Sequence, residues 1–280
     1  MDSGSDDGTP GAARAAGAKV LEIPGAEFRH GPTRNLGAEA LPEVDTVVFL
    51  VQDAVPVGRD FLATLEEALR ADPELGAVTA RQAPPEDADV FTRSTVERSP
   101  AHGGQPVKLG PFTPGTLDSW SAREWRGRLA LDSIALAVRG PLFRRVRFRE
   151  TDFGEDALLA YDLLWGGWAL GHEPRAVVRH GHAYDPQTVQ PRYRQDAAFF
   201  RERFGLRVRP GLASLLKGFV AELRADRRWL QGQGLATPGR LQASRRLRWA
   251  QVLAQYQGSQ GPVGVLPARR PVPGPAELAA

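Results

Sequence analysis

Acidic residues and histidines gather at four places in the sequence where their side chains could serve a reactive site. Carboxylates and imidazoles are the groups that most often accept and donate protons in enzymes. The four places are the stretch DSGSDDGT (residues 2–9), Asp53, the adjacent pair Glu155 and Asp156, and the pair His180 and His182.

Each of these places also has a purely structural interpretation. Asp, Ser and Gly form tight turns, so residues 2–9 fit a capped turn. Acidic residues in a first helical turn complement the helix dipole, which would account for Glu155 and Asp156. Histidines two apart on a strand share one face and could simply be packed or exposed.

Asp53 stands where an open α/β sheet would place a ligand. The run TVVFLV before it is β-branched and aromatic, which is typical of a strand buried on both faces. Polar residues begin at Gln52, so Asp53 falls at the carboxyl end of that strand.

The surrounding pattern predicts alternating strands and helices. Helices are expected at Thr9-Pro10 onward, at 60–71 with Asp60 as cap, and at 153–168 with an acidic first turn and a Gly-Gly stop. Expected strands cover 20–23, 46–51, 75–82, 132–140 and 175–184. Residues 83–93 read as a loop, and 93–121 as a long mobile segment beside the site.

The last third of the chain has a different character. Amphipathic stretches rich in Arg and Trp predict helices at 192–203, 211–230 and 239–257. We therefore divide the chain into a catalytic α/β domain (1–190), a helical extension (191–257) and a Pro/Gly-rich tail (258–280) expected to be disordered.

Composition excludes several classes of protein. The chain has 280 residues, no cysteine and a net charge of +3, so disulfides and thiolate metal sites are absent. The charge is nearly balanced, which argues against a nucleic-acid binder. The longest apolar run, Val47–Val51, is far short of a membrane span, so we expect a cytoplasmic protein.

The order of the motifs resembles the nucleotide-sugar glycosyltransferases of family 2, which have the GT-A fold. The matching stretches are DSGSDDGT, FRHGPTRNLGAE, VVFLVQDAVP, LDSIALAVRG, FGEDALLAYDLLWGGW and EPRAVVRHGHAY. The whole pattern is most similar to the rhamnosyltransferase-like branch and covers about Asp2 to Tyr193. It implies an α/β sandwich with a mixed, mostly parallel sheet.

The resemblance also implies roles for individual residues. Asp2 and Ser3 would contact the base or ribose of the donor, and Arg34 its diphosphate. Asp53 matches the last acidic residue of the family's DxD motif, although Val51 and Gln52 replace the rest. Asp53 and His182 would then hold Mg²⁺ or Mn²⁺, which suit oxygen and imidazole ligands.

Transfer from a nucleotide diphosphate requires that the leaving phosphate be neutralised and that the acceptor hydroxyl lose its proton. Asp156 is the candidate base, with Glu155 beside it contacting the acceptor or the backbone. At a helix start the dipole would lower the pKa of Asp156 and keep it ionised. A single displacement inverts the anomeric centre, and one base suffices.

The family has a strand and a helix before the first turn, and this sequence opens at the turn itself. We expect either that the true start lies upstream, which we favour, or that the fold lacks its first β-α portion. In the second case the strand at 20–23 would have unpaired edge groups.

The expected partners are a nucleotide-sugar donor and a polysaccharide or glycolipid acceptor, with no nucleic acid. A catalytically inactive interaction protein that retains the fold is the alternative. The C-terminal helices, with Trp229 and Trp249, either pack on the catalytic domain or rest on the inner face of an anionic membrane.

Overall fold

Six strands form one mixed sheet in the computed structural model of the chain, which describes residues 1–129 and 131–279. The strands are β1 (Thr46–Leu50), β2 (Val55–Val57), β3 (Leu75–Ala83), β4 (Val107–Leu109), β5 (Ala135–Arg139) and β6 (Ala169–Arg179). Their order is β1-β5-β3-β6-β2, with β4 also paired to β6.

The α/β class and the mixed sheet are confirmed, but parallel pairs do not predominate. Among the described pairings β3 with β6 is parallel, whereas β1–β5, β3–β5, β2–β6 and β4–β6 are antiparallel. The strand predicted to be buried on both faces, β1, instead alternates between buried and partly exposed residues, because it lies at the edge of the sheet. Its neighbour β5 is the strand buried on both faces, and an apolar run does not encode strand direction.

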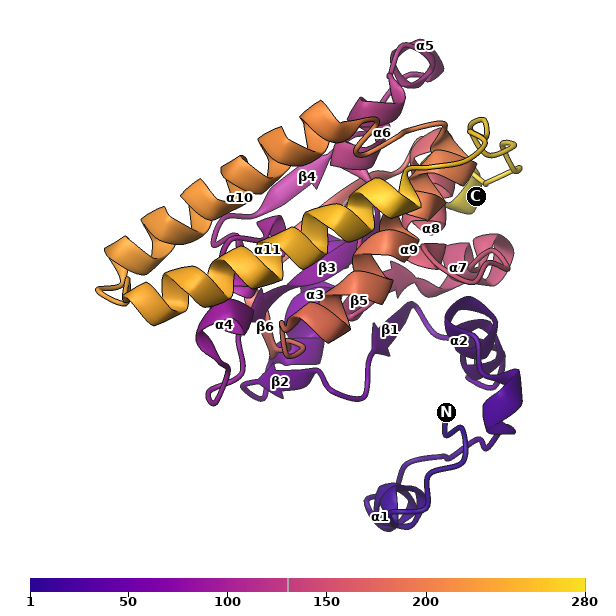
Figure 1. The fold of residues 1–280 in the computed structure, drawn as a ribbon. Coiled ribbons are helices and arrows are strands. Elements are labelled where there is room, and N and C mark those ends of the chain that lie inside the picture. The colour runs from indigo at the N-terminus through magenta and orange to yellow at the C-terminus, as the bar shows by residue number, and fades with distance from the viewer. Residues whose placement is uncertain (130, 280) are drawn as a thin grey trace.

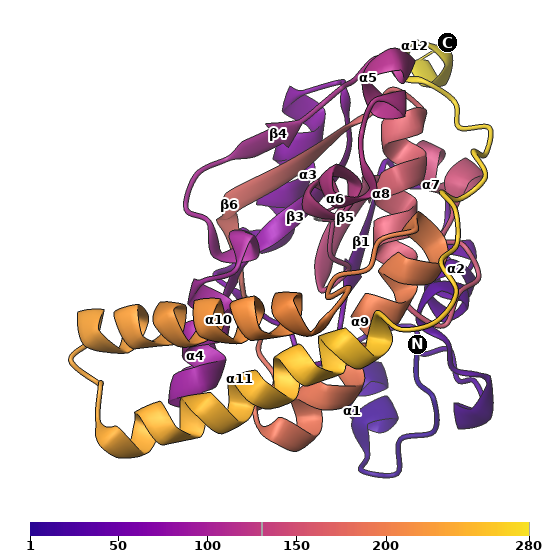
Figure 2. The ribbon, with the colours of Figure 1, turned by 45° about the horizontal axis from the view of Figure 1, so that its top comes forward.

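Helices cover both faces of this sheet (Figures 1 and 2). The helices against the sheet include α3 (Phe61–Ala71), α4 (Val90–Glu97), α7 (Gly140–Val146) and α8 (Glu155–Trp165). The apolar face of α3 packs with Val78 and Val178 in one cluster, and α7 and α8 share a larger cluster with β1 and β5. The central strands have apolar side chains on both faces. Each face is therefore covered by its own hydrophobic core.

Most expected elements form, and the largest discrepancy is at 93–121. That stretch holds the end of α4, a 3₁₀ turn at Pro100–His102, β4, and α5 (Pro114–Asp118), and α6 (Ala122–Arg128) follows it. Side-chain caps from Asp89, Thr113 and Ser121 start these helices, which are too short to give a clear hydrophobic period.

The N-terminal segment does not join the sheet. It contains α1 (Thr9–Ala15), a 3₁₀ turn at Gly25–Glu27 and α2 (His30–Glu39), and α1 lies well away from the strands (Figure 1). The strand expected at 20–23 is reduced to one parallel bridge between Asp2 and Glu22. No described strand continues that bridge into a ladder.

Three long helices follow the sheet. The second and third lie close to the boundaries expected from sequence, whereas the first begins six residues earlier than expected, before the predicted domain boundary at 190. They are α9 (Pro186–Phe204), α10 (Leu212–Gly232) and α11 (Pro238–Gly258). Helices α10 and α11 form a hairpin, and α11 packs along α9. None of the described helices has the length and hydropathy needed to cross a bilayer.

The tail was expected to be disordered, and the structure instead packs it against the core. Proline carbonyl oxygens accept hydrogen bonds from two buried donors, Tyr161 Oη to Pro267 and Trp168 Nε1 to Pro273. Arg270 reaches the buried carboxylate of Asp162 at 3.0 Å, and α12 (Pro275–Ala279) ends the described chain. Specific pairing with the core replaces the regular structure that Pro and Gly prevent; Ala280, the last residue of this predicted tail, lies outside the described part.

Candidate active site

Strand pairing brings Asp53 to two histidines. Val55 of β2 pairs with Arg179, the last residue of β6, so the turn before β2 faces the residues that follow β6. Oδ2 of Asp53 lies 3.6 Å from Nε2 of His180 and 3.4 Å from Nδ1 of His182. The three side chains thus meet at one corner of the sheet although they are distant in sequence.

This group has the ligand types and the spacing for a divalent cation. One atom from each of the three side chains lies within 4.8 Å of the others. His180 is buried, and its Nε2 has no hydrogen-bond partner among the described residues. Burial also lowers the pKa of His180, which favours the neutral imidazole that binds metals.

The structure adds His180 to the two metal ligands expected from sequence. The sequence places His180 and His182 two residues apart, on one face of a strand, but the predicted ligand pair contained only Asp53 and His182. Their rings lie 4.8 Å apart in an edge-on arrangement, with Asp53 against both. The spacing was therefore the usable signal.

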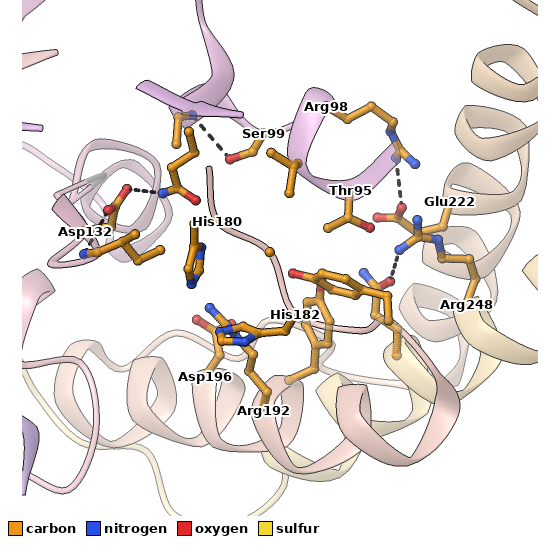
Figure 3. Close-up of a pocket in the computed structure, with 18 of the residues that line it drawn as sticks. Thr95, Arg98, Ser99, Asp132, His180, His182, Arg192, Asp196, Glu222 and Arg248 are labelled. Atoms are coloured by element: carbon orange, nitrogen blue, oxygen red, sulfur yellow. Dashed lines mark hydrogen bonds and ion pairs between the residues drawn. The ribbon is translucent and has the colours of Figure 1, made fainter. Parts of the chain in front are cut away.

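A pocket of about 470 Å³ opens beside the two histidines, between the sheet and the C-terminal helices (Figure 3). Charged residues on its wall are Arg98, Arg126, Asp132, Arg192, Asp196, Glu222 and Arg248. Phe153, Tyr184 and Tyr193 supply aromatic surface. Such a mixture of aromatic and charged groups suits a polar, anionic molecule.

Asp132 is a carboxylate of this wall that the sequence analysis passed over. It follows directly on the core residue Leu131 and accepts hydrogen bonds from Gln82 Nε2 at 2.9 Å and from the backbone N–H of Ile134 at 3.2 Å. Burial raises its pKa to about 6. Asp132 begins the quoted stretch DSIALAVRG, so its position before a buried strand was the available signal.

Asp156 lies at the start of α8, as expected, but its pKa shifts the other way. Burial and the adjacent Glu155 carboxylate raise the pKa of Asp156 to about 7, with a smaller contribution from Asp132. The backbone N–H of Ala157 donates to Oδ1 at 2.7 Å and opposes the shift. The effect of desolvation on the pKa of Asp156 therefore outweighs the effect of the helix dipole.

Glu155 and Arg34 form an ion pair with each other, both largely buried. The pair fixes α2 against α8, and Asn35 adds two hydrogen bonds to the backbone of Phe148. We had expected Arg34 near a diphosphate and Glu155 near the acceptor. Neither of them lines the described pocket.

Asp2 and Ser3 lie in the N-terminal segment. Asp2 caps its own turn by accepting hydrogen bonds from Ser5 Oγ, Gly4 N and Ser5 N, and those from Ser5 contribute most to lowering its pKa. Neither residue lines the described pocket. The structure therefore brings Asp53 and His182 together and leaves Asp2 and Ser3 outside the pocket wall.

Comparison with known proteins gives relatives of one kind. No protein-family model matches the chain. The O-antigen chain rhamnosyltransferases RfbN of Salmonella typhimurium and WbaN of Salmonella anatum are each 27% identical to it, over 207 and 208 residues. These matches cover 71% of this chain and 61% of each relative, so the chain spans less than two thirds of their length.

A solved structure shares the fold. The mannosyltransferase PcManGT from Pyrobaculum calidifontis, in complex with GDP-Man and Mn²⁺, aligns over 91% of this chain and 76% of its own, with a TM-score of 0.51 and 20% identity. The resemblance to sugar-nucleotide glycosyltransferases and the α/β fold expected from sequence are thereby confirmed.

Proposed function

We propose that this chain is an inverting glycosyltransferase. It moves a sugar, with rhamnose as the favoured candidate, from a nucleotide-diphospho-sugar to a hydroxyl of a polysaccharide or glycolipid acceptor. The observation that carries the proposal is the meeting of Asp53, His180 and His182, because the two histidines also line a pocket that contains Asp132. The rhamnosyltransferase relatives and the neighbour that binds GDP-Man and Mn²⁺ support it.

Asp53, His180 and His182 would hold Mg²⁺ or Mn²⁺, whose charge would neutralise the leaving diphosphate. Asp2 and Ser3 for the nucleoside and Arg34 for the diphosphate keep the roles implied by the resemblance. Arg192 is a further candidate for the diphosphate. It lines the pocket beside His182 and has no ion pair among the described residues (Figure 3).

Asp156 is the proposed base. Its carboxylate takes the proton of the acceptor hydroxyl while the hydroxyl oxygen bonds to the anomeric carbon. The bond from that carbon to the diphosphate breaks on the opposite face, which inverts the centre and releases the nucleoside diphosphate. A pKa of about 7 suits proton transfer at neutral pH. Glu155, paired with Arg34, lies next to the base in sequence and raises its pKa.

Replacement of the base tests this proposal. Asp156→Asn should lower transfer about 10²- to 10⁴-fold, the usual contribution of a general base. Asp152→Asn is the matched control because Asp152 is exposed and precedes the same helix. The measurement is release of free nucleotide from a panel of sugar nucleotides, with and without Mn²⁺ and with acceptor.

Unchanged transfer in Asp156→Asn would contradict the mechanism. Donor binding without any nucleotide release by the unmutated chain would instead favour the inactive interaction protein.

A further inference from the structure

The outer face of the α10–α11 hairpin carries an exposed apolar ridge. Leu212, Leu216 and Val220 recur every four residues along α10 and are 66%, 55% and 42% exposed. Trp249 of α11 is 42% exposed, and its ring meets that of Phe219 with centroids 5.3 Å apart. This contact joins the two helices into one surface, which we call the outer face.

Unpaired cations accompany this ridge. Lys217, Arg224, Arg227, Arg228, Arg245 and Arg246 are all exposed. None of the six forms an ion pair with a carboxylate among the described residues. Other arginines, such as Arg98, Arg126 and Arg248, do form such pairs. Residues 212–258 contain eight Lys or Arg and two acidic residues, in a chain whose net charge is only +3.

The two acidic residues of the hairpin point away from that surface. Asp226 is buried and accepts two hydrogen bonds from Arg248, at 2.8 Å each, and one from Ser244 at 2.6 Å. Glu222 pairs with Arg98 and lines the pocket. The outer face is therefore cationic as well as apolar, with no carboxylate of its own to balance it.

We propose that the outer face docks on an anionic phospholipid membrane. Apolar side chains at helical spacing beside Arg and Lys match a helix lying in the interface, where the ridge enters the headgroup region and the cations meet lipid phosphates. A second copy of the chain fits less well, because a two-fold contact would set arginines against arginines.

The opposite face of the same hairpin forms part of the pocket wall. Glu222, Arg248 and Gln251 line the pocket from α10 and α11 (Figure 3). Docking would hold the pocket about one helix diameter, roughly 10 Å, from the lipid. Docking would place the pocket near molecules that are anchored in the lipid. If the proposed sugar transfer is correct, the acceptor is therefore a saccharide attached to a lipid; only this statement rests on the proposed function.

Vesicle flotation of the full chain tests the docking. Vesicles of phosphatidylcholine mixed with phosphatidylglycerol should carry the protein upward, whereas phosphatidylcholine alone should not, and added salt should release it. Arg245→Glu with Arg246→Glu should weaken binding more than about 20-fold, since each cation near such a surface is worth about five-fold. Leu216→Ser with Val220→Ser should weaken it even in low salt.

Arg144→Glu with Arg145→Glu is the matched control. It reverses an adjacent, exposed pair on α7, distant from the hairpin, and should leave flotation nearly unchanged. Equal loss in both reversals, or no flotation with anionic vesicles, overturns the proposal. A dimer in solution that Leu216→Ser with Val220→Ser dissociates, without vesicle binding, would assign the face to a second copy. None of these outcomes depends on donor hydrolysis.

Discussion

Asp156 and Asp132 are half-buried carboxylates whose pKa values, about 7 and about 6, exceed the ordinary range. Between pH 4 and pH 7 these two carboxylates therefore bind more protons in the folded protein than in the unfolded chain. Their contribution to the free energy of unfolding should fall as pH rises through this interval, whereas the lowered pKa of His180 acts in the opposite direction.

Asp156→Asn removes the larger of these two contributions. Above pH 7 the variant should be more stable than the unmutated chain, by at most about 4 kcal/mol at about 1.4 kcal/mol per pKa unit. Its stability should also vary less with pH. Urea unfolding at several pH values checks this, with Asp152→Asn as control, and an unchanged pH slope would show that Asp156 is not the titrating group.

The three-residue cluster at the sheet corner makes a separate prediction. Replacing His180 by Gln should weaken Mn²⁺ binding at least about tenfold, the lower bound for disturbing a metal site. The same loss is expected for His182→Ala. His30→Ala is the control, since His30 is exposed at the start of α2. Calorimetric titration with Mn²⁺ alone measures these affinities. Equal Mn²⁺ affinities in all three variants would contradict a metal site at this cluster.

At the scale of single residues, the sequence singled out Asp53, His182 and Asp156 as candidates, and the structure places Asp53 and His182 in one cluster with His180. Side-chain type and spacing can be read from a sequence, whereas burial cannot. The pKa of Asp156 was expected to be low because only the helix start was visible, and the desolvation that raises it comes from the surrounding fold.

At the scale of elements, the α10–α11 hairpin is fixed to the sheet body by one buried network. Arg98, which follows α4, donates to Asp226 at 2.5 Å, and Trp229 Nε1 donates to Glu97 at 3.1 Å. Arg248 and Ser244 complete the hydrogen bonds to Asp226. One carboxylate therefore joins α4, α10 and α11.

Asp226→Ala should destabilise the protein by about 3–5 kcal/mol, because it leaves the buried Arg248 without its counter-charge. Glu222→Gln is the control and should cost less than about 1 kcal/mol, since Glu222 is a quarter exposed. Urea unfolding distinguishes the two. Similar losses would mean that the network contributes no more than a surface pair.

Long periodic elements were predictable and short ones were not. Helices α3 and α8 begin within two residues of the expected positions, although the cap expected from Asp60 is not formed by its side chain. Helices α4, α5 and α6, of 5–8 residues, have too few turns for a period, and side-chain caps define them instead.

At the scale of the whole molecule, the resemblance predicted the fold class. The order of the tail and the direction of the strands depend on tertiary contacts, which the sequence does not show. The tail looked disordered because Pro and Gly suppress regular structure. Its partners, Tyr161 and Trp168, lie about a hundred residues earlier, so no local pattern could reveal them. Strand direction at β5 was hidden in the same way.

The α10–α11 hairpin has a cavity on one side and a basic, apolar surface on the other, and this imposes a thermodynamic rule. If a lipid surface shifts the two helices so that acceptor binds more tightly by some factor, bound acceptor must strengthen adhesion to lipid by the same factor. Protein with bound acceptor would then stay on the membrane longer, where further acceptor is found. Protein without acceptor would dissociate from the membrane sooner.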